Sequence, residues 1–181
     1  MKTEHQPLIS IVIPTYNHAD FLKRALTSII KQNYEDWEVI IIDNHSNDHT
    51  EEVVYSFENP KIRFFKIHNN GVIGLSRNYG IDKASGKWIA FMDSDDIWYP
   101  SRLSVCSEFY GEDKYKIDVI STNELMVFSG INKQKVLRHG PASENMYRDM
   151  LLYGNRLSPS ATIVSKSFLT KNNLKFSEAI E

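Results

Sequence analysis

Apolar residues in the N-terminal half of the chain follow two alternating patterns. Continuous runs rich in Val and Ile occupy residues 8–14, 37–43, 62–67 and 88–92, and such runs are typical of buried strands. Between them, apolar residues recur three and four positions apart, which predicts helices, and Asn17 is placed to cap the first of these. The alternation predicts right-handed crossovers and an α/β protein with a Rossmann-like, mostly parallel sheet flanked by helices.

The pattern is looser in the second half of the chain. We expect a helix over residues 102–112, a single strand over 118–128, a loop or hairpin over 129–145 and a further strand over 160–164. No repeat, low-complexity stretch or linker interrupts the sequence. We therefore predict one domain, residues 1–181.

The composition narrows the class of protein. Of 181 residues, 41% are hydrophobic and 24% are charged, which is ordinary for a soluble globular protein. A formal net charge of −2 and the lack of a Lys/Arg block argue against a nucleic-acid partner. Cys106 is the only cysteine, so we expect no intrachain disulfide, a reducing compartment and a packing role for this side chain. No apolar run approaches the ~20 residues of a membrane-spanning helix.

The most informative segment is Asp-Ser-Asp-Asp at residues 93–96, directly after the predicted strand 88–92. Carboxylates this close together repel one another unless a cation or a ligand compensates them. Oxygen ligands suit a hard divalent ion, Mg²⁺ or Mn²⁺, that also binds a phosphate. The alternative interpretation is a solvated turn in which an Asp caps the next helix.

Two other predicted strands also end in polar or aromatic residues. The first ends in Pro14, Thr15, Tyr16 and Asn17, and the second ends in Asp43. Since ligands of open α/β sheets bind at the carboxyl ends of the strands, these ends and the acidic segment predict a pocket for a flat, polar, phosphate-bearing molecule. In it, Tyr16 could stack on a base, and Asp43 could accept hydrogen bonds from a base N–H or a ribose hydroxyl. The alternatives are a rim aromatic and a turn cap.

At this point the chain resembles the family 2 inverting glycosyltransferases. The motifs that carry the resemblance lie in order at residues 10–17, 39–43, 69–80, 84–88 and 93–96. The match covers about residues 8–102. It implies a GT-A fold of the nucleotide-diphospho-sugar transferase superfamily.

The resemblance implies roles for the matched residues. The donor-binding set would be Pro14, Thr15, Tyr16, Asn17, Asp43, Arg77, Asp93 and Ser94. Within it, Thr15 and Tyr16 would line the base pocket, and Asp43 would hydrogen-bond the nucleoside. Arg77 would lie near the base or the diphosphate, and Asp93 near the ribose.

The resemblance also implies a metal site. Asp95, together with Asp93, would bind Mn²⁺ or Mg²⁺ and through it both phosphates, and Asp96 could substitute for either. One departure from the family pattern is His45, which stands where a small residue is usual. His45 and His49 could suggest a transition metal, but we favour a solvated turn.

The expected function is metal-dependent transfer of a sugar, with inversion, from a nucleotide-diphospho-sugar to a hydroxyl acceptor in polysaccharide or glycan biosynthesis. A UDP-sugar is the first choice of donor, and a glycan or lipid-linked molecule is the expected acceptor. The resemblance places the catalytic base at or beyond Glu181. We therefore expect a fragment with a donor half at about residues 8–102 and an incomplete acceptor half at about 103–181, which binds nucleotide but transfers sugar poorly. We expect it in the cytoplasm, at the inner face of the membrane if a region beyond Glu181 associates with it.

Other functions remain open from the residues alone. A sugar-nucleotide nucleotidyltransferase usually carries a Gly-rich loop with Arg or Lys after the first strand, and residues 14–17 are not of that kind. A non-catalytic module that binds a nucleotide or a sugar is the alternative from another class. A response-regulator domain needs an Asp on its third strand, and residues 62–67 contain none. A dinucleotide-binding dehydrogenase would need G-x-G-x-x-G after the first strand, which is absent.

Overall fold

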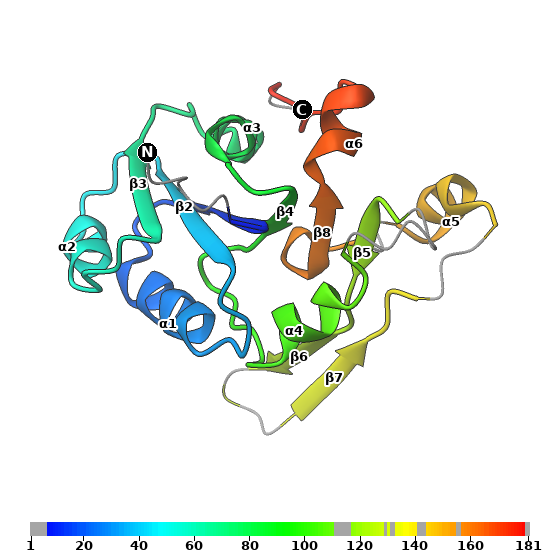
Figure 1. The fold of residues 1–181 in the computed structure, drawn as a ribbon, viewed down its shortest axis with the longest axis horizontal. Helices are drawn as coiled ribbons and strands as arrows, with labels where there is room; N and C mark the ends of the chain where they lie inside the picture. Colours follow the sequence, from blue (N-terminus) through cyan, green and yellow to red (C-terminus); the bar gives the residue numbers. More distant parts are fainter. Residues whose placement is uncertain are drawn as a thin grey trace, which may run out of the picture.

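The computed structural model describes residues 7–110, 117–128, 130, 133–140, 144–154 and 157–179. Its centre is a six-stranded sheet in which the first four strands of the chain run parallel to one another (Figure 1). The fifth strand across the sheet is antiparallel to both of its neighbours. Across the sheet the strands are β3 (Ile62–Lys66), β2 (Trp37–Asp43), β1 (Ile9–Thr15), β4 (Trp88–Phe91), β8 (Thr162–Ser165) and β5 (Val119–Ser121). This architecture confirms the predicted mostly parallel α/β sheet.

Helices cover both faces of the sheet, and each face has its own apolar core. One face is covered by α1 (Ala19–Ile30), α2 (Thr50–Tyr55) and α4 (Arg102–Ser107), and the other by α3 (Ile73–Lys83) and α6 (Lys166–Lys171) (Figure 1). Because side chains alternate along a strand, Ile11 and Ile13 face the first core while Val12 faces the second. Burial on both faces explains why these strands are almost wholly apolar.

The helix α3 lies against the central strand β1 at Gly80. A Cβ atom at this position would lie 2.3 Å from the Val12 Cγ1 atom, so a larger residue would push the helix off the sheet. The close approach fixes the distance between the sheet and α3, which carries Arg77. Cys106 of α4 is buried in the core of the opposite face, which agrees with the packing role expected for it.

Two predictions for the second half are wrong. Residues 118–128 form two strands in different sheets, because β5 pairs with β8 while β6 (Glu124–Phe128) pairs with β7 (Lys133–Leu137). The Thr122 N–H donates to the Ala161 carbonyl oxygen at 3.0 Å, at the point where the chain leaves the main sheet. The helix expected over 102–112 ends at Ser107. Within 129–145, which we expected to be a loop or hairpin, the described residues include β7, and its antiparallel partner β6 lies before this segment.

Three short elements lie on the path to the end of the described chain. They are α5 (Met146–Tyr153), which the sequence did not predict, the 3₁₀ turn η1 (Pro159–Ala161), and β8, which confirms the strand expected near 160–164. Since β8 is antiparallel to β4, η1 lies beside the carboxyl end of β4, where the acidic segment begins.

Strand β3 is an edge of the main sheet, and cationic side chains lie over aromatic rings along it. Lys61 Nζ lies 4.8 Å from the centroid of the Trp37 ring, Arg63 Cζ 5.3 Å from that of Phe65, and Lys66 Nζ 5.8 Å from that of Phe64. Charged groups therefore line this edge.

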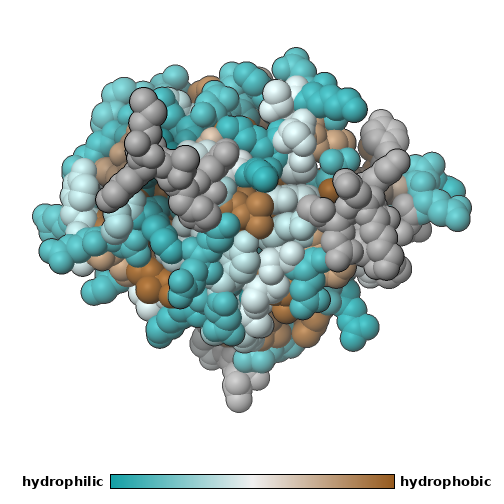
Figure 2. Space-filling view, in the orientation of Figure 1, coloured by the Kyte–Doolittle hydropathy of each residue, from teal (hydrophilic) through white to brown (hydrophobic). Residues whose placement is uncertain are grey.

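The surface is mostly polar on the face that Figure 2 shows, with apolar side chains in small separate patches. Within the described ranges, the structure contains no helix with the length and apolar character that crossing a membrane requires.

Candidate functional site

The parallel register brings the ends of β1, β2 and β4 to one edge of the sheet. Thr15 lies opposite Asp43, and the Met92 N–H donates to the Val12 carbonyl oxygen at 3.1 Å, so the acidic segment begins beside β1. Pro14, Thr15 and Asp43 are buried, whereas the Tyr16 side chain is half exposed at this edge. The structure thus brings together the strand ends that the sequence predicted as a site.

The turn after β1 is tied to the turn after β2. Asn17 has a left-handed backbone with φ 51°, its N–H donates to Ser46 Oγ at 2.8 Å, and its Oδ1 accepts from the Asn47 N–H at 2.7 Å. The prediction that Asn17 caps α1 is therefore wrong, because its side chain faces the neighbouring turn. Asp48 takes that role from a distance, since its Oδ2 accepts from the Ala19 N–H at 3.0 Å. These bonds fix both turns relative to each other.

The Asp48 carboxylate is stabilised in its ionised form. Burial alone would raise the pKa of Asp48, but hydrogen bonds from Thr50 and from the Ala19 N–H outweigh it and hold the pKa below its ordinary value. A negative charge is thus kept beside the first turn of α1, where the helix dipole favours it.

Asp43 serves as a turn cap in this structure. It is 1% exposed, its Oδ2 accepts from the Ser46 N–H at 3.0 Å, and its Oδ1 accepts from the Ser46 hydroxyl. This is the alternative role that the residues alone left open, and a contact with a nucleoside stays a prediction.

The histidines near this turn are not gathered as metal ligands. The ring of His45 stacks on that of His68, with 3.8 Å between centroids and 11° between planes, and His49 Nε2 lies 3.5 Å from Asp20 Oδ1. Among the residues that the structure describes, no group of three or more His, Cys, Asp or Glu side chains is placed to hold a metal ion. Any ion bound at this edge would therefore complete its coordination with ligand oxygens or water.

In the acidic segment, Asp93 forms an ion pair with Arg77 of α3. Arg77 Nη2 donates to Asp93 Oδ1 at 2.7 Å, and Arg77 is only 8% exposed. Within the described part of the chain, the buried Nε atom of Arg77 has no hydrogen-bond partner. A buried guanidinium N–H without an acceptor is unfavourable, so this atom is suited to an anionic ligand.

The three carboxylates of this segment differ in their surroundings. Asp95 is exposed, whereas Asp96 is half-buried. Burial, reinforced by the charges of Asp95, Asp93 and Glu124, raises the pKa of Asp96 above its ordinary value, and a hydrogen bond with Ser160 opposes the rise only in part. An exposed carboxylate next to one that is already paired fits Mg²⁺ or Mn²⁺, which commonly takes one or two protein carboxylates and fills the rest of its shell with phosphate oxygens and water.

Ser160, which the sequence did not indicate as a site residue, holds the acidic segment through three hydrogen bonds. Its Oγ accepts from the Asp93 N–H at 2.9 Å, its side chain bonds the Asp96 carboxylate, and its carbonyl oxygen accepts from Trp98 Nε1 at 3.2 Å. The sequence carries no signal for this role, because a single Ser after a Pro is common and its partners lie more than 60 positions away. His18 makes a similar contact from α1, with its Nδ1 2.8 Å from Ser94 Oγ.

A buried cation lies next to this segment. The Arg102 guanidinium lies 3.9 Å from the centroid of the Trp98 ring, and burial lowers the pKa of Arg102 to about 10. Arg102 therefore remains charged at neutral pH, and its charge interacts with those of Asp96 and Glu124.

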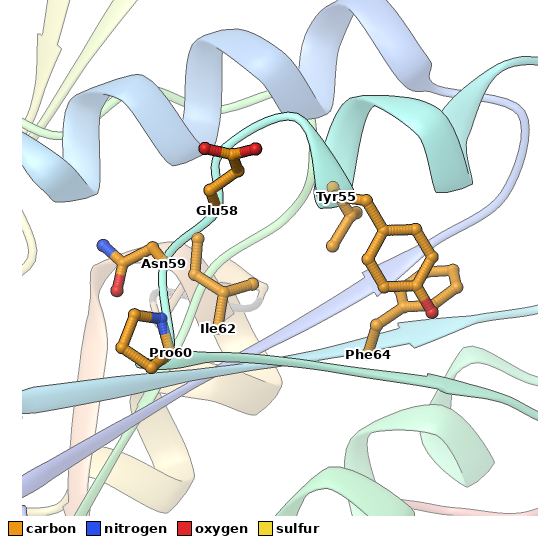
Figure 3. Close-up of a pocket in the computed structure, with 7 residues that line it drawn as sticks. Tyr55, Glu58, Asn59, Pro60, Ile62 and Phe64 are labelled. Carbon is orange, nitrogen blue, oxygen red and sulfur yellow. The ribbon is translucent and has the colours of Figure 1, made fainter.

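A shallow hollow of about 460 Å³ lies away from these residues. It is lined by α2, the turn after it and β3, with Tyr55, Phe64 and Glu58 around its rim (Figure 3). No residue predicted as part of the site lines it. We assign it no role in nucleotide binding.

Comparison with known proteins identifies the family. A sequence model described as glycosyl transferase family 2 matches residues 10–163, which is most of the chain. The chain belongs to this family. The match runs from β1 to β8 and includes all three strand ends of the site.

Two curated glycosyltransferases resemble the chain over part of their length. TuaG of Bacillus subtilis (strain 168), a glycosyltransferase assigned provisionally to teichuronic acid biosynthesis, is 32% identical over 112 residues, 61% of this chain and 44% of TuaG. WfgD of Escherichia coli, a UDP-Glc:alpha-D-GlcNAc-diphosphoundecaprenol beta-1,3-glucosyltransferase, is 36% identical over 99 residues, 54% of this chain and 39% of WfgD. The matched part thus spans less than half of either relative.

A solved neighbour, TarS, shares the fold. Residues 1–349 of TarS from S. aureus match 96% of this chain and 51% of the TarS chain, with 26% identity and a TM-score of 0.75. The same part of TarS in complex with UDP matches 94% of this chain and 50% of that chain, with 25% identity and a TM-score of 0.72. The predicted GT-A fold is therefore confirmed.

Proposed function

We propose that this chain binds the donor of a family 2 glycosyltransferase that works in polysaccharide or glycan biosynthesis and transfers a sugar from a UDP-sugar to a hydroxyl group with inversion. The observation that carries the proposal is the buried Arg77 beside the exposed Asp95. Arg77 is paired with Asp93, and its Nε atom has no hydrogen-bond partner among the described residues. The relatives support the choice of donor, since WfgD is named for UDP-Glc and TarS is described in complex with UDP.

Each residue has a distinct part in donor binding. The half-exposed ring of Tyr16 offers a face on which a base stacks. Arg77 donates to a diphosphate oxygen through N–H groups that Asp93 does not use, which gives its buried Nε a partner. Ser160 and His18 hold the acidic segment in place through Asp93 and Ser94. The base, the diphosphate and the metal-binding carboxylate are thereby aligned along one sheet edge.

The proposed metal ligands are Asp95 and Asp93. A Mn²⁺ or Mg²⁺ bound there supplies positive charge that stabilises the leaving diphosphate. Asp95 is the better placed of the two, because it is exposed and Asp93 already accepts from Arg77. Asp96, whose raised pKa reflects its buried and acidic surroundings, is the weaker candidate.

The acceptor half of the reaction needs a base that takes a proton from the attacking hydroxyl group. The residue proposed for this role lies at or beyond Glu181, which is outside the described residues. The acceptor that we propose is a glycan or a lipid-linked molecule, since the name of WfgD includes a diphosphoundecaprenol-linked sugar. We also propose that the protein works in the cytoplasm, and at the inner face of the membrane if a further region associates with it.

Calorimetric titration of UDP, GDP, CMP and NAD into the chain, with and without Mn²⁺, tests the donor site. We expect UDP to bind best, to need Mn²⁺ for full affinity, and to lose that dependence in Asp95→Ala. The matched control is Asp82→Ala, which removes an exposed carboxylate of α3 that is not part of the predicted site. A folded sample that binds no nucleotide in either condition would contradict the proposal.

A further inference from the structure

Residues 174–178, which we call the C-terminal strap, lie along α3 without regular secondary structure. The approach is closest at Gly74, where a Cβ atom would lie 2.1 Å from the Ser177 carbonyl oxygen and 3.2 Å from Phe176 Cβ. Any side chain at position 74 would force the strap away from the helix. The strap therefore follows a path that α3 is shaped to accept.

Asn78 of α3 anchors the strap with its amide group. Its Nδ2 donates to the Phe176 carbonyl oxygen at 3.0 Å and to Glu178 Oε1 at 2.8 Å, while its Oδ1 accepts from the Phe176 N–H at 3.0 Å. Asn78 is only 6% exposed, so these bonds satisfy a buried polar group. They join segments separated by about a hundred positions in the sequence.

The strap also contacts the residue that we assign to the donor diphosphate. The Phe176 ring centroid lies 5.2 Å from the Arg77 guanidinium carbon, and the ring packs edge-to-face on Phe91 with 5.0 Å between centroids. On its other side, Arg77 donates to Asp93 at 2.7 Å. A continuous set of contacts thus runs from the strap through Phe176 and Arg77 to the acidic segment.

We propose that the C-terminal strap is part of the donor site. In this arrangement Phe176 is a positioning residue for Arg77, and Asn78 holds Phe176 in place. The inference rests on the proposed function, in which Arg77 binds the nucleotide diphosphate. The aromatic face restrains the guanidinium and favours its charge. A nucleotide that fixes Arg77 therefore stabilises the strap, and by thermodynamic linkage an ordered strap strengthens nucleotide binding by the same factor.

Two measurements on this chain test the coupling, with matched controls. In the first, UDP is titrated in the presence of Mn²⁺ into Asn78→Ala and Phe176→Leu, and we expect both to bind UDP about fivefold more weakly or worse. The controls are Asn172→Ala, whose amide makes one local bond to the Phe168 carbonyl oxygen, and Phe168→Leu, whose ring packs on the same apolar core. Both controls should stay within about twofold of the unaltered chain, because neither residue touches Arg77.

The second measurement is hydrogen exchange of peptides that cover the strap, with and without UDP. We expect UDP to slow this exchange in the unaltered chain and not in Asn78→Ala. Exchange in β1 and β4 reports whether each variant stays folded. If Asn78→Ala unfolds, Phe176→Leu, which keeps an apolar side chain, tests the coupling between the strap and UDP binding in its place. UDP binding by the unaltered chain together with unchanged affinity in folded variants would overturn the coupling alone. Failure of the unaltered chain to bind any nucleotide would overturn the proposed function and the coupling with it.

Discussion

Buried charged groups at the two ends of the central sheet differ in their hydrogen-bond and charge partners. At the amino end, Glu38 of β2 accepts from Ser10 Oγ at 2.7 Å, from the Ser85 N–H at 2.6 Å and from Arg63 Nη1 at 2.9 Å. At the carboxyl end, Asp96 is surrounded by other carboxylates, and the buried Nε of Arg77 lacks a partner among the described residues. At the amino end, partners within the chain compensate the charge of Glu38. At the carboxyl end, a ligand is left to compensate Asp96 and Arg77.

The pKa directions agree with this difference. Burial would raise the pKa of Glu38, but the hydrogen bonds from Ser10, Ser85 and Arg63 outweigh it and lower the pKa below its ordinary value. The pKa of Asp96 is raised, because burial and neighbouring negative charges act in the same direction. We therefore assign Glu38 at the amino end to stability, and Arg77 with the acidic segment at the carboxyl end to ligand binding, whereas Asp43 at that same end caps a turn. Each of the following variants tests one side of this division.

The largest effect is expected for Glu38→Ala, which breaks the network at the amino end. Removal of one partner from a buried ionic network costs about 3 kcal/mol. We therefore expect the free energy of unfolding of Glu38→Ala, measured by urea denaturation, to fall by about that amount. The control Glu52→Ala removes an exposed carboxylate of α2 and should change it by less than about 0.5 kcal/mol. UDP affinity of the folded variant should be unaltered, so a loss of affinity without a loss of stability would contradict the division between the two ends.

The next largest effect is expected for Arg77→Lys at the carboxyl end. Lysine keeps the charge but cannot bind Asp93 and a diphosphate with a rigid fork of donors, so we expect UDP affinity in calorimetry to fall about tenfold, which is about 1.4 kcal/mol. Arg24→Lys, on the exposed surface of α1, is the control. If Arg77→Lys instead lowered stability and spared UDP binding, Arg77 would belong with the structural residues.

A smaller effect is expected for Ser160→Ala, which removes the support behind the acidic segment. The loss of a hydrogen-bond acceptor for the Asp93 N–H and of the bond to Asp96 should weaken Mn²⁺-dependent UDP binding by about fivefold, which is about 1 kcal/mol. Binding without Mn²⁺ should change little, which separates positioning of the carboxylates from general damage. The control is Ser158→Ala, in the same turn region, where the bonds seen among the described residues are made by the Ser158 carbonyl oxygen. This variant should behave as the unaltered chain.

The smallest effect is the acid response of Glu38. Because its pKa is lowered in the folded protein, its contribution to stability is fully present above its ordinary value of 4.5 and is lost as pH falls through the lowered pKa. The difference in unfolding free energy between the unaltered chain and Glu38→Gln, measured in urea from pH 7 to pH 3, should therefore shrink below that value. A difference that stays constant with pH would show that the charge of Glu38 makes no contribution.

The sequence predicted the parallel half of the fold and the meeting of three polar strand ends at one edge of the sheet, because both depend on local patterns. Strand β2 matches the expected residues 37–43, since an apolar strand buried on both faces leaves a continuous run. The acidic segment was found because three carboxylates stand close together directly after such a run.

Predictions failed where a residue's partner lies far away in the sequence. Asn17 has the composition of a helix cap, but its left-handed backbone turns its side chain to Asn47, and the sequence gives no sign of that bond. Ser160 and Asn78 have partners about 67 and 98 positions away. The run at 118–128 contains no Gly or Pro to mark the point where the chain changes from one sheet to another.

The cations along β3 have a consequence for the behaviour of the protein in concentrated solution. An edge strand with free backbone groups is a template on which strands of other molecules assemble into aggregates, and charged side chains along the edge are a common protection against this. Lys61, Arg63 and Lys66 all lie on this edge, each over an aromatic ring. They cover apolar surface that would otherwise favour association. Arg63 and Lys66 are paired with Glu38 and Glu51, so an incoming copy of the strand would have to strip water from these ion pairs to reach the backbone of β3. This cost opposes self-association through the edge.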